Sequence, residues 1–388
     1  MHFTNQLPEE TTIHWHGVRL NAEMDGVPEH SQPAVPTGGS FDYDFVVPDA
    51  GLFWYHPHVD SAAQVGNGLY GALLVEPRPN DAGAEHPADP LGAAKLGPEL
   101  VLVLSDVATN EDGTLGDPNS GGELGALFGR EGDLVLVNGR VGPTVLARRG
   151  QRQRWRLVNA AKSRYFQLAL AGHTFTRIGV DGGLLPAPQE AEMLVLAPGE
   201  RADVLVTPQG EPGTTLPVRW VPYDRGFGST EFRPEVETFY VRFTDDEPIA
   251  DVPALPASLR TIAPLDLQNA IARDLSLTGS LVDNKLVLGI NGVPSSEAEP
   301  LHANVGDTEV WTVTNTMDWD HPFHLHGFFF QVLDPAIPLA WKDTVNVPRQ
   351  TAVQFAVRYD DRPGMWMFHC HILDHAEAGM MGMIHLAH

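Results

Sequence analysis

Short runs of apolar residues recur along the whole chain, separated by turns rich in glycine and proline. The runs are rich in Val, Leu, Phe and Thr, as around Val158 and Val313. Many such runs with frequent turns predict an all-β sandwich or barrel. Gly and Pro number 38 and 32, and charged residues make up only 19% of the chain, which also favours a β fold over a helical one.

An internal repeat organises these runs. An asparagine ends an apolar run at Asn5, Asn159 and Asn315. The positions nine and eleven residues further on hold His14 and His16, Leu168 and Leu170, and His324 and His326. We therefore predict three related β-domains, the middle one without metal ligands.

Composition sets the expected domain limits at 1–80, 98–246 and 268–388. Segments rich in proline, 77–98 and 245–264, are predicted linkers, and 268–274 is a candidate short helix. About twenty residues of strand material precede Asn159 and Asn315, but only four residues precede Asn5. The first domain is therefore expected to lack its opening strand or strands.

The run His369-Cys370-His371 contains the only cysteine of the chain. In a strand, the sulfur would point to one face and both imidazoles to the other. A cysteine followed by His375 and Met380 matches a blue-copper electron-transfer site, in which two histidines and one cysteine bind copper and a methionine is the weak axial ligand. The two flanking histidines then remain for a second metal centre.

Four His-x-His pairs supply the residues for that second centre. On a strand, each pair presents both imidazoles on one face, and imidazole suits copper, zinc, iron and nickel. One pair alone would be weak evidence, but eight histidines in a repeated frame suit a cluster of two or three metals between the first and third domains. The pairs are His14 and His16, His56 and His58, His324 and His326, and His369 and His371. His321 remains for the Cys370 site.

The net charge of −25 argues against binding to nucleic acid or an anionic membrane. No apolar run reaches transmembrane length, and a single cysteine excludes an internal disulfide. The chain opens directly into an apparent strand with no signal peptide, so we expect either a cytosolic protein or a true start further upstream.

These motifs resemble the four copper-binding motifs of three-domain multicopper oxidases, the laccase group. The resemblance rests on His14–Gly17, Trp54–His58, His321–Gly327 and the Cys370 run, together with Pro198–Val204 in the middle domain. It implies three consecutive cupredoxin-like Greek-key β-sandwich domains. It also implies a periplasmic or secreted location and four copper ions: one type 1, one type 2 and two type 3.

Carried over by position, the resemblance assigns each ligand. The type 1 copper would be held by His321, Cys370 and His375, with Met380 axial and Met381 as the alternative. The type 2 copper would be held by His14 and His324. One type 3 copper would be held by His16, His56 and His371, and the other by His58, His326 and His369.

The implied reaction is one-electron oxidation of substrates, coupled to four-electron reduction of dioxygen to water. Electrons would enter at the edge of His321 or His375 and pass through Cys370. Water formation needs protons, and Asp25 stands where the family carries an acid. Some bacterial relatives have a glutamate where this chain has Ala376, and neither Asp374 nor Glu377 can be assumed to replace it.

Three functions remain open at this point. The first is oxidation of phenols and aromatic amines. Because an axial thioether from Met380 would lower the type 1 potential, we expect easily oxidised compounds to be better substrates than high-potential ones. The turn 223–226 would shape substrate approach, or it is a structural turn with an Asp–Arg pair. The second is oxidation of Cu(I) or Fe(II), with Met365, Met367, Met381 and Met383 as a soft-metal entry or as packing residues. The third is copper binding without turnover. The oligomeric state is not predicted.

Overall fold

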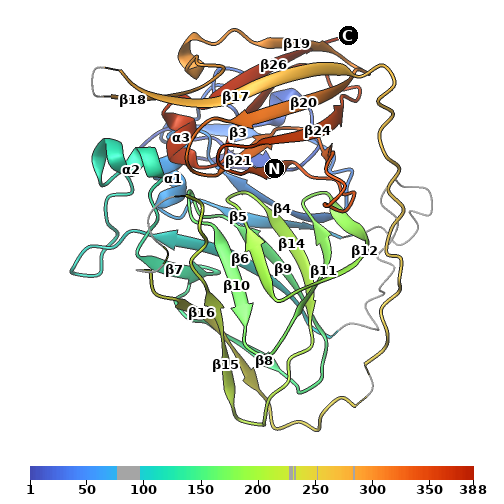
Figure 1. The fold of residues 1–388 in the computed structure, drawn as a ribbon. Coiled ribbons are helices and arrows are strands. Elements are labelled where there is room, and N and C mark those ends of the chain that lie inside the picture. The colour runs from blue at the N-terminus through green and yellow to red at the C-terminus, as the bar shows by residue number, and fades with distance from the viewer. Residues whose placement is uncertain (77–96, 227–229, 231–232, 251, 283–284) are drawn as a thin grey trace.

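The computed structural model describes residues 1–76, 97–226, 230, 233–250, 252–282 and 285–388 (Figure 1). Nearly all regular structure in these residues is β, arranged in six sheets. The all-β prediction is therefore confirmed. Most of the first predicted linker lies outside the described residues. Residues 252–264 of the second one form no helix or strand and run along the side of the molecule (Figure 1).

Residues 1–76 form two small sheets, one of two strands and one of three. The first sheet pairs β1 (His2–Thr4) with β3 (Ser40–Asp42). The second has the order β2 (His14–His16), β4 (Gly51–His56) and β5 (Gly71–Val75). Two short helices, η1 (Ala22–Met24) and α1 (Ser61–Gly66), complete this unit. It carries fewer strands than either of the two units that follow.

Residues 99–243 form two facing sheets of six and five strands. The larger has the order β12 (Gly183–Ala191), β11 (Phe175–Val180), β14 (Arg201–Val206), β9 (Gln153–Asn159), β6 (Glu99–Val107) and β7 (Leu134–Val137). The smaller has the order β13 (Met193–Leu196), β10 (Phe166–Leu170), β15 (Thr215–Trp220), β16 (Val236–Phe243) and β8 (Thr144–Ala147). Helix α2 (Gly122–Phe128) lies in the loop between β6 and β7.

Residues 271–387 form two five-stranded sheets. The first has the order β18 (Lys285–Ile290), β17 (Ile271–Val282), β20 (Thr308–Asn315), β24 (Ala352–Arg358) and β22 (Phe330–Val332). The second has the order β19 (Leu301–Asn304), β26 (Met381–Ala387), β25 (Gly364–Cys370), β21 (His321–Leu325) and β23 (Thr344–Val347). The short helices are η4 (Ser295–Glu297) and α3 (Leu373–Glu377). The helix expected at 268–274 is wrong, because β17 begins at Ile271 and pairs in parallel with β20.

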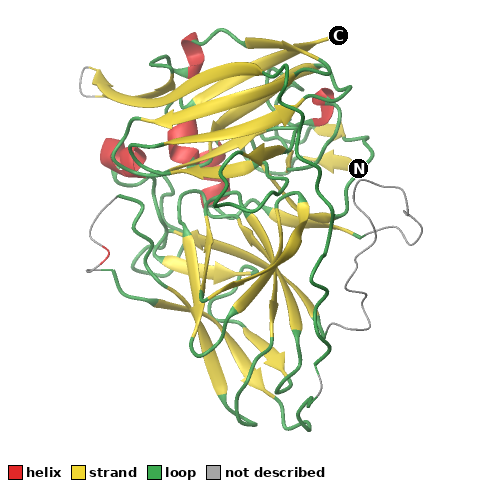
Figure 2. Cartoon of the chain, turned by 45° about the vertical axis from the view of Figure 1, so that its right-hand side comes forward, coloured by secondary structure: helices red, strands yellow, loops and turns green. Residues whose placement is uncertain are grey.

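The hydrophobic cores explain how these units hold together. One large core joins residues of the first and third units, for example Trp15 and Trp366, whereas a separate core fills the middle unit around Trp155. Most of the short helices lie in the upper half of the molecule (Figure 2), and among them α3 contacts both α1 and α2. The predicted limits at 80, 98, 246 and 268 stay predictions, although no sheet among the described residues crosses them.

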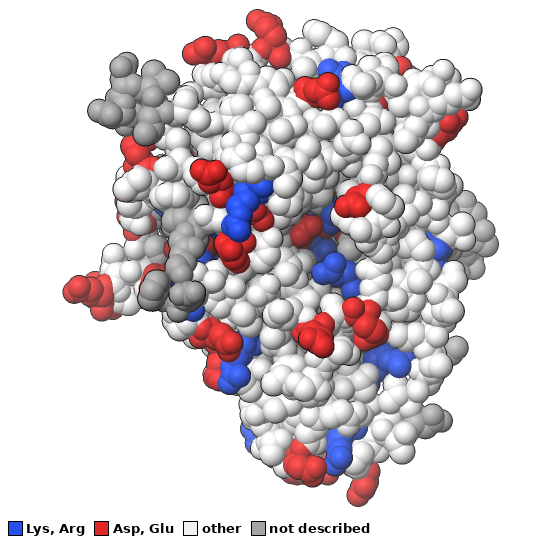
Figure 3. All heavy atoms as spheres, viewed as in Figure 1, with Lys and Arg blue, Asp and Glu red and all other residues white. Residues whose placement is uncertain are grey.

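The surface carries acidic and basic side chains as small separate patches on the face seen in Figure 3. Among the described residues, no helix combines the length and the apolar character that crossing a membrane requires.

The repeated asparagines have the same structural role in all three units. Asn5, Asn159 and Asn315 are fully buried. In each, Oδ1 accepts a hydrogen bond from the backbone N–H two residues later, and Nδ2 donates to two backbone carbonyls. The side chain therefore fixes the turn that follows each apolar run, which explains why the sequence repeat begins there.

We predict that Asn159→Ala lowers the free energy of unfolding by about 3 kcal/mol, because three buried backbone groups lose their partners. Thermal or denaturant unfolding measures this change. Asn110→Ala is the control, since Asn110 also bonds to backbone but is exposed, and it should cost less than about 1 kcal/mol. Equal effects of the two substitutions would contradict the proposed role of the repeated asparagine.

Candidate metal centre

Strand β25 separates the candidate ligands onto two faces of its sheet. Its register places His369 opposite His324 and Cys370 opposite Phe323 on β21. Because side chains alternate along a strand, the Cys370 sulfur points into the core of the third unit and His369 points to the opposite face. Strand β25, which ends at Cys370, thus supplies candidate ligands on both faces of the sheet, as the sequence predicted.

On the Cys370 face, three donor atoms converge. Nδ1 of His321 lies 3.4 Å from Sγ of Cys370, and Nδ1 of His375 lies 3.6 Å from it. The two Nδ1 atoms are 3.1 Å apart. Two imidazoles and one thiol in a compact triangle form the donor set of a blue-copper site.

This triangle is covered by protein. His321 and His375 are both 0% exposed. Nε2 of His375 donates a hydrogen bond to the carbonyl of Leu127 in α2, at 3.0 Å. The expected entry of electrons at the edge of His321 or His375 stays a prediction, and neither ring edge is exposed in this structure. In this conformation, an electron donor would contact the residues that cover the two rings.

Met380 is the axial candidate that fits this geometry. It is fully buried in the same core as Cys370, and its carbonyl accepts a hydrogen bond from the Cys370 N–H at 3.1 Å. Met381, the alternative, pairs with His369 across β25 and β26. It therefore lies on the face away from the Cys370 sulfur.

On the opposite face, the eight histidines of the four pairs meet between the first and third units. Nε2 of His326 lies 3.1 Å from Nε2 of His369, and Nδ1 of His16 lies 3.2 Å from Nε2 of His371. The rings of His14 and His326 stack at 3.9 Å between their centroids. Groups of three ligand atoms lie within 4.8 Å of one another, namely His14, His58 and His326; His14, His16 and His56; and His324, His326 and His369.

Main-chain carbonyls fix the tautomers of several of these rings. Nδ1 lies 2.8 Å from a carbonyl oxygen in His14, His324 and His369. Because a carbonyl only accepts, Nδ1 must carry the proton, and the lone pair of Nε2 faces the centre of the cluster. Nε2 of His14, His56, His58 and His324 is buried without a hydrogen-bond partner among the described residues. These free lone pairs fit a set of bound metal ions.

Two aspartates support the cluster in matching ways. The carbonyl of Asp25 accepts from His14, and its carboxylate lies 2.7 Å from Nδ1 of His326. The carbonyl of Asp343 accepts from His324, and its carboxylate lies 3.2 Å from Nε2 of His16. Each aspartate therefore holds one ligand of its own unit and one of the other unit.

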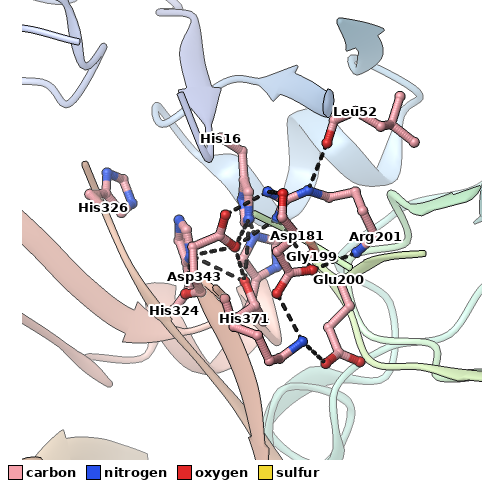
Figure 4. A network of polar contacts seen from close by, with 12 residues as sticks. His16, Leu52, Asp181, Gly199, Glu200, Arg201, His324, His326, Asp343 and His371 are labelled. Atoms are coloured by element: carbon pink, nitrogen blue, oxygen red, sulfur yellow. Dashed lines mark hydrogen bonds and ion pairs between the residues drawn. The ribbon is translucent and has the colours of Figure 1, made fainter. Parts of the chain in front are cut away.

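The two aspartates differ in their other partners. Oδ1 of Asp25 lies 3.3 Å from Nδ1 of His14 and accepts no well-aligned hydrogen bond from the described residues. The carboxylate of Asp343 accepts hydrogen bonds from both terminal nitrogens of Arg201, at 2.6 and 2.5 Å, and both side chains are buried (Figure 4). The carboxylate of Asp25 therefore faces two cluster histidines, whereas that of Asp343 is held by the two-pronged contact with Arg201.

Arg201 brings the middle unit into contact with the cluster. It also donates to the carbonyls of Leu52, Gly199 and Asp181, each at 3.2 Å (Figure 4). Gly17 has φ +84°, and a Cβ there would lie 2.3 Å from a nitrogen of Arg201. The glycine of the His14–Gly17 motif is therefore required for the Arg201–Asp343 pair to approach His16.

Burial keeps the ligands in the state that binds metal. It lowers the pKa of His371 and His375 to about 3 and that of His326 to about 4, so these imidazoles are neutral at pH 7. Burial also raises the pKa of Cys370 to about 12, and a bound metal ion would have to displace its proton. Burial raises the pKa of Asp25, but attraction by His326 and His14 outweighs it and lowers the pKa overall.

The acids next to Ala376 are used elsewhere. Asp374 accepts from Arg130, Lys162 and Ser163. Glu377 accepts hydrogen bonds from both the N–H and the hydroxyl of Ser61 at the start of α1. Neither carboxylate contacts a histidine of the cluster in the described residues, so neither replaces the glutamate that is absent at Ala376.

The sequence reasoning missed Asp343, Arg201 and the cover formed by α2. Arg201 lies in the motif 198–204, which carried a resemblance but no role. The turn 223–226 contains an aspartate that does form an ion pair, but with Arg349 and not with Arg225. Tyr223 of this turn donates to Asp320, the neighbour of His321, at 2.9 Å.

Comparison with known proteins agrees with this geometry. Residues 1–80, 99–215 and 266–386 each match a family described as multicopper oxidase. The multicopper oxidase MmcO of Mycobacterium tuberculosis is 33% identical, over 97% of this chain and 77% of that protein. A laccase of Bacillus subtilis is 28% identical, over 96% of this chain and 79% of that protein.

Solved structures give the same answer. A Campylobacter jejuni multicopper oxidase, described as a metallo-oxidase, superposes with a TM-score of 0.85 at 28% identity, over 99% of this chain and 82% of that one. The multicopper oxidase of Pseudomonas thermotolerans superposes with a TM-score of 0.79 at 32% identity, over 100% of this chain and 88% of that one. The predicted cupredoxin-like architecture is thus confirmed, and the chain belongs to the multicopper oxidase family of copper-dependent oxidoreductases.

Proposed function

We propose that this protein oxidises phenols and aromatic amines by single electrons at a type 1 copper and reduces dioxygen to water at a trinuclear copper cluster. The arrangement of β25 is the observation that carries this proposal. His321, Cys370 and His375 converge on one face, while His369 and His371 join six histidines on the other. One strand end therefore links an electron-accepting site to a site large enough for several metal ions.

The donor atoms suit four copper ions in total. His321, Cys370 and His375, with Met380, would hold the type 1 ion, and the free Nε2 atoms of His14 and His324 would hold the type 2 ion. The type 3 ions would be held by two sets of three histidines, one from His16, His56 and His371 and one from His58, His326 and His369. Within these sets, His16 lies beside His371 and His326 lies beside His369. When bound, copper supplies one-electron redox chemistry and the capacity to reduce dioxygen.

The protein's own residues have three tasks in this mechanism. The peptide backbone at Cys370 joins the thiolate covalently to His369 and His371, which gives electrons a short path between the two faces. The cover over His375 limits access to small or surface-bound reductants. Asp25 would pass protons toward the cluster, because both of its carboxylate oxygens lie beside cluster histidines: Oδ1 is 3.3 Å from Nδ1 of His14 and Oδ2 is 2.7 Å from Nδ1 of His326.

Oxidation of Cu(I) or Fe(II) is the second candidate. The Campylobacter jejuni relative is described as a metallo-oxidase. However, the methionines around β25 and β26 lie on the His369 face and not on the Cys370 face, so they do not lead a metal substrate to the type 1 site. This placement favours organic reductants. A copper protein without turnover is the remaining alternative.

Copper analysis combined with oxygen consumption tests the proposal. The copper-loaded protein should contain about four copper ions per chain, the number that these ligands accommodate. It should consume oxygen faster with 2,6-dimethoxyphenol than with Cu(I). Cys370→Ser should lose the type 1 copper and oxygen uptake. A protein with at most one copper ion, or with no oxygen uptake, would refute the oxidase proposal, and faster uptake with Cu(I) would support the metallo-oxidase.

Asp25→Asn should lower kcat for the phenol by about 100-fold, because it removes a proton carrier. The amide oxygen can still accept the hydrogen bond from His326, so copper content and KM should not change. Steady-state oxygen uptake and copper analysis measure these quantities. Asp25→Ala removes the contact with His326 as well and should also reduce copper content. An unchanged kcat for Asp25→Asn would exclude the proton role.

Arg201→Met should disturb the cluster, because it leaves Asp343 buried without its cation. Such a change costs about 3–5 kcal/mol of stability, and the type 2 copper signal in electron paramagnetic resonance should change. Arg154→Met is the matched control, since Arg154 forms a buried pair with Asp203 in the same unit. It should lower stability but leave the copper spectrum intact. Identical spectra for both variants would show that Arg201 has only a structural role.

A further inference from the structure

The outer face of β25 and β26 carries an unbroken row of methionines and histidines. The register pairs Met365 with His385, Met367 with Met383, and His369 with Met381. Paired residues of antiparallel strands share a face, and alternate residues along each strand do so too. All six side chains therefore lie on one face, which is also the face of the histidine cluster.

The row extends to the edge of the sheet. On β19, His302 lies beside His385, with 5.8 Å between their ring centroids. Both of these histidines are exposed. At the other end, His369 contacts His326 of the cluster at 3.1 Å between the Nε2 atoms. The row thus connects solvent to a predicted type 3 ligand.

These methionines stand apart from the hydrophobic clusters, although Met367 itself is buried. The opposite face of the same strands carries Trp366, Phe368, Ile384 and Leu386, all buried in the large core. The methionines on the outer face, by contrast, belong to none of the hydrophobic clusters formed by the described residues. Met365, Met381 and Met383 are partly exposed, and Met367 is 7% exposed.

The chemistry of the row selects one metal ion. Thioether sulfur is a soft ligand that prefers Cu(I), and imidazole binds copper as well. Four of the nine methionines of the chain stand here at alternating strand positions. Directly opposed side chains on such strands have Cβ atoms about 5 Å apart, which lets neighbouring long side chains share one ion.

We propose that this row, from His302 and His385 through Met365, Met383, Met367 and Met381, binds Cu(I) and delivers it to the histidine cluster. Transfer proceeds by ligand exchange: a copper–thioether bond breaks as a copper–imidazole bond forms, and no electron changes hands. This role concerns assembly of the metal centre and is separate from substrate oxidation. It would hold even for a copper protein without turnover.

The rate of Cu(I) uptake tests this proposal. Copper-free protein is mixed under anaerobic conditions with the coloured Cu(I)–bicinchoninate complex, and the loss of colour is followed over time. Replacing Met365, Met367, Met381 and Met383 by leucine keeps apolar volume. It should slow Cu(I) uptake by about tenfold, the lower end of what loss of a supporting group costs at metal sites. Uptake of Cu(II) sulfate and the final copper content should not change.

Two controls make the outcome decisive. Met193 lies on β13, outside the row, and is 48% exposed. The Met193→Leu variant should therefore take up Cu(I) at the same rate as the unsubstituted protein. In the unsubstituted copper-free protein labelled with 13C at the methionine methyl groups, Ag(I) as a Cu(I) analogue should shift the four row signals before that of Met193. Equal uptake rates for the fourfold variant, or no shift of the row signals, would overturn the proposal. Neither measurement involves phenol or dioxygen, so failure here is distinct from failure of the oxidase proposal.

Discussion

The alternation of side chains along β25 is the constraint on which the rest of this structure depends. Because neighbouring residues of a strand face opposite ways, Cys370 and its two flanking histidines must serve two different sites. The core side receives the sulfur together with His321 and His375. The outer side receives the imidazoles. Two clusters of candidate metal ligands are thereby joined through a few covalent bonds, whatever reductant the protein uses.

The outer site is built by parts that cannot form it alone. The first and third units supply the imidazoles, and each of the two aspartates binds a ligand from both units. The middle unit adds Arg201, which neutralises Asp343 in a buried setting where an unpaired carboxylate would be costly. A unit without metal ligands is therefore part of the metal centre. The two carboxylates also differ in pairing: Asp343 is bound by an arginine, whereas Asp25, which we propose as the proton carrier, contacts only histidines of the cluster through its carboxylate among the described residues.

The sequence predicted the all-β fold and the two-faced ligand set because both follow from local periodicity. Asn5, Asn159 and Asn315 mark the same buried turn, so the repeat they begin was visible without a structure. Contacts between distant segments were not visible. Asp343 stands in no motif, and the cover of Leu127 over His375 depends on a loop of the middle unit. The expected helix at 268–274 failed because pairing with β20 overrode a weak local preference.

Anomalous X-ray diffraction from crystals of the copper-loaded protein, measured at the copper absorption edge, tests the central claim most directly. The account predicts one peak among His321, Cys370 and His375 on the core face of β25. It predicts a separate group of peaks among the paired histidines on the outer face. Peaks confined to one face, or no peak beside Cys370 in fully loaded protein, would contradict it.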